Sequence, residues 1–143
     1  MASWVDGTTY PGPMADITLD DVITDSQRYG PFAYLATTSA SSTPYVSPAS
    51  VAWVDGTLCA FVATGSAKVA NVRAHPSMCV HFAVGESTNW DSCIVWGGVE
   101  IVETAEGRAE LWARMGYDLS QFEPGGPESD GHVFLRLTPT KAV

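Results

Sequence analysis

Asp55-Gly56 stands between two apolar runs, and this pair constrains the fold more than any other feature of the sequence. Asp and Gly tolerate the left-handed backbone conformation that a two-residue hairpin turn requires. Residues 45–54 and 58–63 are therefore predicted to pair as neighbouring antiparallel strands. Pro48 lies inside the first of these runs, which indicates a bulge or an edge position, because proline has no N–H to donate to a partner strand.

Four further runs have the length and composition of strands, and three short segments have the pattern of helices. The strands are expected at residues 32–38, 78–84, 93–102 and 133–137, and the helices at residues 18–28, 66–75 and 104–116. The helices do not alternate strictly with the strands, so a doubly wound parallel sheet is disfavoured. The expected fold is mainly β, a six-stranded antiparallel barrel with short flanking helices, in one domain over residues 16–143 that follows an irregular arm over residues 1–15.

Charge and cysteine content exclude several classes of protein. Acidic residues outnumber basic ones by 16 to 7, which gives a formal net charge of -9 at pH 7. So few cations cannot build a nucleic-acid-binding face, and they argue against attraction to an anionic membrane. We expect no membrane span and no signal peptide, because no apolar run is long enough and residues 1–14 lack a basic start. Three scattered cysteines without a Cys-x-x-Cys pair favour a reduced, cytoplasmic protein.

The sequence offers no metal site and no side chain that we would name as catalytic. Its three histidines have no paired spacing among themselves or with cysteine, so a metal site is not expected. Ser47 and Ser50 lack the Gly-x-Ser-x-Gly turn of a serine hydrolase. His132 precedes the last strand in a Gly-rich loop and is expected to be exposed, whereas His81 lies on a strand, where a structural role is the commoner one.

A possible anion site lies where an apolar strand passes into the second helix, and it contains Thr64, Gly65, Ser66, Lys68 and Asn71. Ser66 is a suitable N-cap, the first amides of the helix point toward the site, and Lys68 adds a full positive charge. These groups together are the donors that a phosphate requires. From the spacing alone, an ordinary capped helix start explains the same residues at least as well.

Four motifs follow one another in a set order. They are Tyr34-Leu-Ala-Thr-Thr38; Pro44-Tyr-Val-Ser-Pro48 with Val54-Asp-Gly-Thr-Leu58; the Thr64–Asn71 segment with Arg73 and Pro76 at the helix end; and Trp90 with Ile94-Val-Trp-Gly-Gly-Val-Glu-Ile101. Their order and spacing resemble the flavin and deazaflavin split-barrel family, whose best-known member is pyridoxamine 5'-phosphate oxidase. The resemblance runs from about residue 32 to residue 137.

The resemblance implies a homodimer with a cofactor site shared between the two subunits. The cofactor ring would lie along the second strand, at Ser47, Pro48, Ala49, Ser50 and Val51. The phosphate end of the cofactor would be held by Thr64, Gly65, Ser66, Lys68 and Asn71. The second subunit would contribute Trp90 and Ser92.

The resemblance also implies an oxidoreductase that transfers hydride or electrons between its cofactor and a small organic substrate. FMN is the expected cofactor, because seven basic residues are few for the long anionic tail of the alternative, the deazaflavin coenzyme F-420. A non-enzymatic protein that binds or senses flavin or haem is the competing interpretation.

Overall fold

The computed structural model describes residues 2–3 and 17–143. Its strands are β1 (Ala2–Ser3), β2 (Phe32–Thr38), β3 (Pro44–Val54), β4 (Thr57–Ala63), β5 (Ser77–Phe82), β6 (Ile94–Val102) and β7 (His132–Ala142). Its α-helices are α1 (Leu19–Ser26), α2 (Ala67–Ala74) and α3 (Ala105–Arg114), and its 3-10 turns are η1 (Gln27–Tyr29), η2 (Glu86–Thr88) and η3 (Leu119–Gln121). The arm predicted for residues 1–15 falls outside the described residues, except that Ala2 and Ser3 pair with the end of β7.

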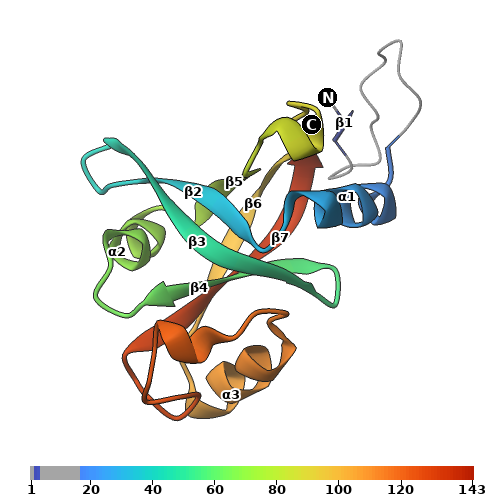
Figure 1. The fold of residues 1–143 in the computed structure, drawn as a ribbon. Coiled ribbons are helices and arrows are strands. Elements are labelled where there is room, and N and C mark those ends of the chain that lie inside the picture. Colours follow the sequence, from blue (N-terminus) through green and yellow to red (C-terminus); the bar gives the residue numbers. More distant parts are fainter. Residues whose placement is uncertain (1, 4–16) are drawn as a thin grey trace.

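Six antiparallel strands close into a barrel in the order β7-β4-β3-β2-β5-β6, with β6 paired back onto β7 (Figure 1). The predicted mainly β antiparallel barrel is therefore confirmed. The turn at Asp55 and Gly56 has positive φ at both residues, 50° and 76°, which matches the right-handed twist of the two strands that it joins. Arg114 of α3 forms a bidentate ion pair with Asp55 at 2.7 and 2.9 Å, and this pair ties the hairpin to the helix.

The last strand is longer than the sequence indicated. We expected it to end at Leu137, before Pro139, but β7 continues to Ala142. A register shift opposite Trp96 and Gly97 lets β7 pass through the proline without losing its pairing with β6. Gly97 is required at this point, because a Cβ atom there would collide with the carbonyl oxygen of Thr138.

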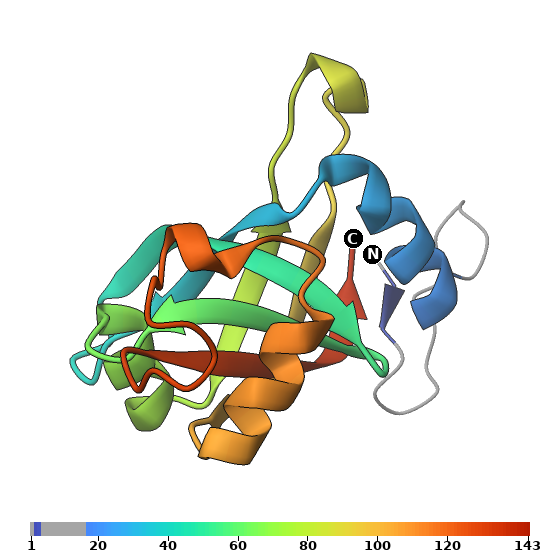
Figure 2. The same ribbon diagram turned by 60° about the horizontal axis from the view of Figure 1, so that its bottom comes forward.

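Three helices cover the barrel at different places, and their caps explain where they begin. Thr18 and Asp21 form a capping box at the start of α1, and Thr104 caps α3 through the amide of Gly107. Figures 1 and 2 show α1 and α2 at opposite ends of the barrel and α3 along its outside. The two end helices close the barrel core, and α3 covers a separate patch of the outer surface.

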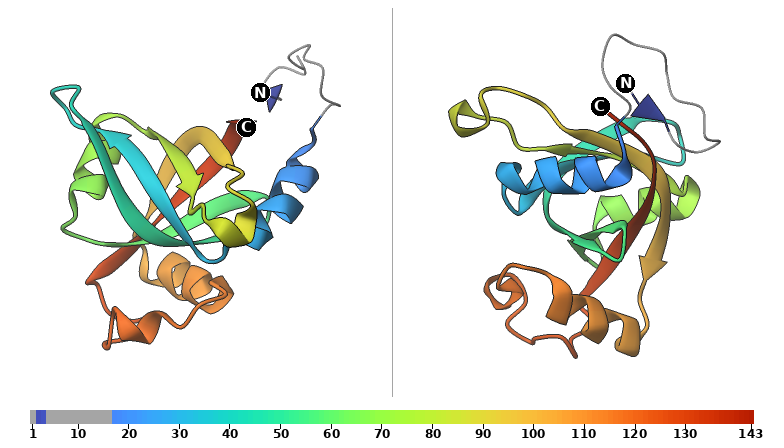
Figure 3. Two further views of the ribbon diagram at one scale, coloured as in Figure 1. Left: turned by 45° about the horizontal axis from the view of Figure 1, so that its top comes forward. Right: turned by 90° about the vertical axis from the view of Figure 1, so that its right-hand side faces the viewer.

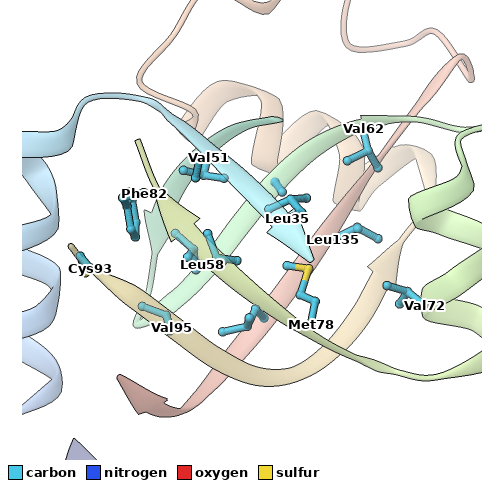
Figure 4. Close-up of a cluster of buried hydrophobic side chains, with 14 of the residues drawn as sticks. Leu35, Val51, Leu58, Val62, Val72, Met78, Phe82, Cys93, Val95 and Leu135 are labelled. Carbon is cyan, nitrogen blue, oxygen red and sulfur yellow. The ribbon is translucent and has the colours of Figure 1, made fainter. Parts of the chain in front are cut away.

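The main core fills the inside of the barrel and consists largely of Val and Leu side chains (Figure 4). Val69 and Val72 of α2 and Val22 of α1 join it from the two ends. Burial alternates along β5, with Met78, Val80 and Phe82 buried. A second, smaller cluster lies between α3 and the outer face of β4 and β7, and it includes Leu111, Leu119 and Phe134.

The barrel opens at one side, and this opening determines where a ligand can enter. Strand β3 pairs with β2 through residues Pro44–Ser50, whereas only Ser50–Val54 pair with β4. From Val62 onward β4 pairs with β7 alone, so β3 and β4 diverge. Pro48 lies in the half of β3 that has no β4 partner, which confirms its predicted edge position. The left panel of Figure 3 shows α2 and the end of β4 beside this opening.

Candidate functional site

A pocket of about 260 Å³ occupies the opening between β3 and β4. Its lining combines predicted residues of β3 and α2 with residues that the sequence did not single out: Phe32, Pro48, Ala49, Ser50, Phe61, Val62, Ala63, Lys68 and Phe122. The edge of β3 that leads into the pocket has no partner strand among the described residues. Its backbone N–H and C=O groups can therefore bond to a ligand instead.

Lys68 supplies the positive charge of this pocket. Its Nζ donates a hydrogen bond to the Oγ of Ser47 at 2.8 Å, which brings two predicted residues of different segments together. Burial lowers the pKa of the Lys68 ammonium, because its single hydroxyl partner does not replace the water that it has lost. An anionic ligand beside this ammonium would restore the missing interaction.

Ser50 presents a second polar group to the pocket. Its side chain is only 4% exposed, and its Oγ has no hydrogen-bond partner among residues 17–143. A buried hydroxyl without a partner is unfavourable, and in native proteins it frequently marks a place where a ligand or water bonds.

The loop between β4 and α2 has the free amides that the sequence predicted. Within the described part of the chain, the N–H groups of Gly65, Ala67 and Lys68 have no backbone partner. Ser66 occupies the N-cap position, but its side chain makes no capping hydrogen bond and its Oγ is unpaired. The start of α2 therefore keeps both its amides and a hydroxyl available at the positive end of the helix dipole.

Two of the predicted phosphate residues are engaged elsewhere in this structure. Asn71 is buried and donates from Nδ2 to the Oγ1 of Thr37 at 3.0 Å, which fastens α2 to β2. Thr64 donates from Oγ1 to the carbonyl oxygen of Asp130 at 2.6 Å, and its amide bonds to the carbonyl oxygen of Gly131 at 3.0 Å. Their contact with a phosphate stays a prediction.

Of the predicted residues, the pocket lining contains only Pro48, Ala49, Ser50 and Lys68. The side chain of Val51 is buried in the barrel core, beside a separate hollow of about 410 Å³ near α1. Trp90 and Ser92 lie in the β5–β6 loop, which projects from the barrel (Figure 2), and Trp90 is 72% exposed. Their predicted role requires a second subunit, and it stays a prediction.

One side of the pocket is formed by Phe32, Phe61 and Phe122, which we call the aromatic wall. Phe122 follows η3 in the loop between α3 and β7, and its ring centroid lies 6.3 Å from that of Phe61. Sequence reasoning missed this wall, because residues 117–131 contain Gly and Pro without any period and show only a loop. The position of Phe122 depends on how that loop folds back over β4.

The prediction that His132 is exposed is wrong, because its side chain is 0% exposed. The ring lies among Phe61, Trp112 and Phe134 at centroid distances of 5.1–5.6 Å. Neither ring nitrogen has a hydrogen-bond partner, although Oε2 of Glu123 lies 4.0 Å from Nδ1. Burial lowers the pKa of His132, and Glu123 opposes this effect. His132 is therefore buried, although the Gly-rich composition of the loop before it indicated a position in solvent.

Comparison with known protein families shows the family of this chain. Residues 19–143 match the family described as pyridoxamine 5'-phosphate oxidase. The chain belongs to that family. The match begins at the first residue of α1 and includes every strand of the closed barrel. No curated protein matches the sequence.

Solved structures of other proteins share this fold. A FAD-binding protein from Mesorhizobium loti is 26% identical, with a TM-score of 0.66 over 84% of this chain and 88% of that one. An F420 reductase is 21% identical, with a TM-score of 0.64 over 83% and 94% of the two chains. HutZ, the heme storage protein from Vibrio cholerae, is 16% identical, with a TM-score of 0.65 over 89% and 94%. The last two similarities show the shared fold alone.

Neither a metal site nor a membrane-spanning helix is found in the described part of the chain. No three His, Cys, Asp or Glu side chains of residues 17–143 come together as metal ligands. No described helix is both long and apolar enough to cross a bilayer. The pocket between β3 and β4, with Lys68 in its lining, is the candidate functional site.

Proposed function

We propose that this protein is a homodimeric oxidoreductase that binds FMN in the pocket between β3 and β4. The observation that carries this proposal is the combination of a ring-sized apolar pocket with Lys68 and the free amides of Gly65 and Ala67. Membership in the pyridoxamine 5'-phosphate oxidase family supports it, as do solved relatives described as FAD-binding and as F420 reductase. The deazaflavin coenzyme is the alternative cofactor.

The residues of this chain would hold the cofactor and exclude water from it. Lys68 and the amides of the β4–α2 loop would bind the phosphate, and the free edge of β3 would bond to polar atoms of the ring. When bound, the flavin or deazaflavin ring supplies the hydride or electron transfer. No side chain of the pocket is assigned as an acid or a base.

The second subunit would cover an apolar area that lies farther along the outer face of the same sheet. A hollow of about 520 Å³ lies over β2, β3, β5 and β6, and Tyr34 and Val46 at its rim are 49% and 62% exposed. Exposed apolar patches of this kind mark protein interfaces. A dimer through this face would bring Trp90 and Ser92 of one subunit toward the other, which supports the shared site.

Titration of the purified protein with FMN and with the deazaflavin coenzyme tests the proposal. Absorbance and fluorescence should show saturable binding of one of the two, and light scattering should show a dimer. Val46→Glu should produce monomers with weakened cofactor affinity, whereas a protein that binds neither cofactor would contradict the proposal. If Lys68→Ala combined with Asn71→Ala leaves the affinity for both cofactors unchanged, the phosphate site is assigned incorrectly.

A haem-binding role is the second candidate, because His81 lines the apolar hollow on the outer face. Nδ1 of His81 donates a hydrogen bond to the carbonyl oxygen of Phe82 at 2.7 Å. The other ring nitrogen, Nε2, is then unprotonated and keeps the lone pair that an iron ligand needs. Titration with haemin should then give a Soret band that His81→Ala abolishes. A flavin spectrum without any haemin binding rejects this candidate.

A further inference from the structure

The aromatic wall surrounds the unpartnered hydroxyl of Ser50. Phe32 of β2, Ser50 of β3 and Phe61 of β4 are directly opposite one another in the sheet. Opposed residues of antiparallel strands project from the same face, so the three side chains form one row. The row places a buried donor between two phenyl rings, and no group among the described residues forms a hydrogen bond with it.

Phe122 completes the wall from a different part of the chain. Its side chain is 53% exposed, and its ring stacks on Tyr117 with centroids 5.9 Å apart and planes 22° apart. Tyr117 also makes an edge contact with Phe32 at 5.0 Å. Tyr117 thus contacts both Phe32 and Phe122 and holds their rings in place. Both phenylalanine side chains stay partly exposed, so a further ring can contact them. An exposed phenylalanine that is fixed in this way is suited to stacking.

We propose that the aromatic wall and Ser50 bind a planar conjugated ring that carries a hydrogen-bond acceptor at its edge, and that Phe122 is a specificity-determining residue for this ring. The phenyl faces contact the ring, and the Oγ–H of Ser50 bonds to the acceptor. The ring belongs either to the cofactor or to a flat substrate such as a quinone, so this site rests on the proposed function.

Two probes without a phosphate separate the two sources of the ring. Lumiflavin carries the flavin ring alone, and menadione is a flat quinone that is added to protein saturated with FMN. Phe122→Ala should weaken the binding of one probe by about 2- to 12-fold, and Phe122→Tyr should restore it. Weakened lumiflavin binding assigns the ring to the cofactor, and weakened menadione binding alone assigns it to the substrate. If neither probe responds, or if the wild-type protein binds neither, the stacking site is wrong.

Ser50→Ala distinguishes a ligand-binding hydroxyl from a structural one. Because the hydroxyl has no partner, its removal should leave the thermal midpoint of the ligand-free protein unchanged or raise it, while the responding probe binds about 2- to 12-fold more weakly. A lower midpoint with unchanged probe affinity would overturn this role. Tyr45→Ala is the matched control, because Tyr45 is another exposed aromatic residue that does not line the pocket, and it should leave both probes unaffected.

The results that would contradict the ring site differ from those that would contradict the proposed function. If the wild-type protein binds menadione at the wall but neither FMN nor the deazaflavin coenzyme, the proposed cofactor is wrong and the ring site stands. If FMN binds equally well to the wild-type, Phe122→Ala and Ser50→Ala proteins and neither probe responds, the ring site is wrong and the proposed function stands.

Discussion

The pocket has two ends that are built in different ways. The proposed phosphate end has Lys68 in the pocket lining, with Thr64 and Ser66 beside it, and these three residues are neighbours in the sequence at one helix start. The aromatic end draws Phe32, Phe61 and Phe122 from segments as much as ninety residues apart. The first end is a local motif that a reader of the sequence can recognise, whereas the second exists only because the loop over residues 117–131 folds back onto the barrel.

The largest effect that we predict concerns the positive charge of Lys68, which lies at the phosphate end of the pocket. Lys68→Ala should weaken FMN binding by about 10- to 100-fold and riboflavin binding much less, because riboflavin has no phosphate. Fluorescence titration measures both affinities. Arg73→Ala is the control on the same helix, where Arg73 pairs with Glu103 on the surface, and it should change neither. Equal losses for the two flavins would place Lys68 at the ring instead of the phosphate.

The second prediction concerns Asn71, which the structure ties to Thr37 beneath α2. Asn71→Ala should lower the free energy of unfolding by about 1–3 kcal/mol, because it leaves the buried Thr37 hydroxyl without its partner. Urea unfolding measures this loss. The ratio of FMN to riboflavin affinity should stay at its wild-type value. A fall in that ratio at unchanged stability would assign Asn71 to the phosphate after all.

The third prediction concerns pH and the aromatic end. Burial lowers the pKa of His132 below its ordinary value of 6.5, so the unfolded chain binds more protons than the folded one below that pH. The free energy of unfolding should therefore fall as the pH drops below about 6.5, by at most about 1.4 kcal/mol per pH unit, and level off beneath the folded pKa. Urea unfolding between pH 7.5 and 5.5 measures this slope. In His132→Leu the slope should shrink, and a wild-type slope in this variant would mean that another group carries it.

The smallest predicted effect concerns the connection between the two ends. Thr64 belongs to the phosphate loop, and its hydroxyl bonds to the carbonyl oxygen of Asp130 in the loop that carries Phe122. Thr64→Val should cost about 1 kcal/mol of stability and increase amide hydrogen exchange in residues 117–131. Unchanged exchange in that segment would show that the two ends of the pocket are independent.

Much of the fold could be predicted because it depends on local patterns. The Asp55-Gly56 turn, the alternation in β5 and the capping box at Thr18 each determine the conformation of their own segment. The course of β7 beyond Pro139 could not be predicted, because it depends on a register shift in the neighbouring strand. The exposure of His132 was predicted wrongly for a similar reason, since its burial is decided by contacts with Phe61 of β4 and Trp112 of α3.

The sequence by itself determined the strands, the hairpin, the helix start beside Lys68 and the family to which these motifs belong. Backbone preferences and charge act over a few residues, so they can be read from the order of the chain. Only the tertiary structure decided that β3 and β4 diverge, that Ser50 lies unpartnered between two phenyl rings and that Phe122 faces them. These features arise from contacts between residues far apart in the chain, and no local pattern encodes such contacts.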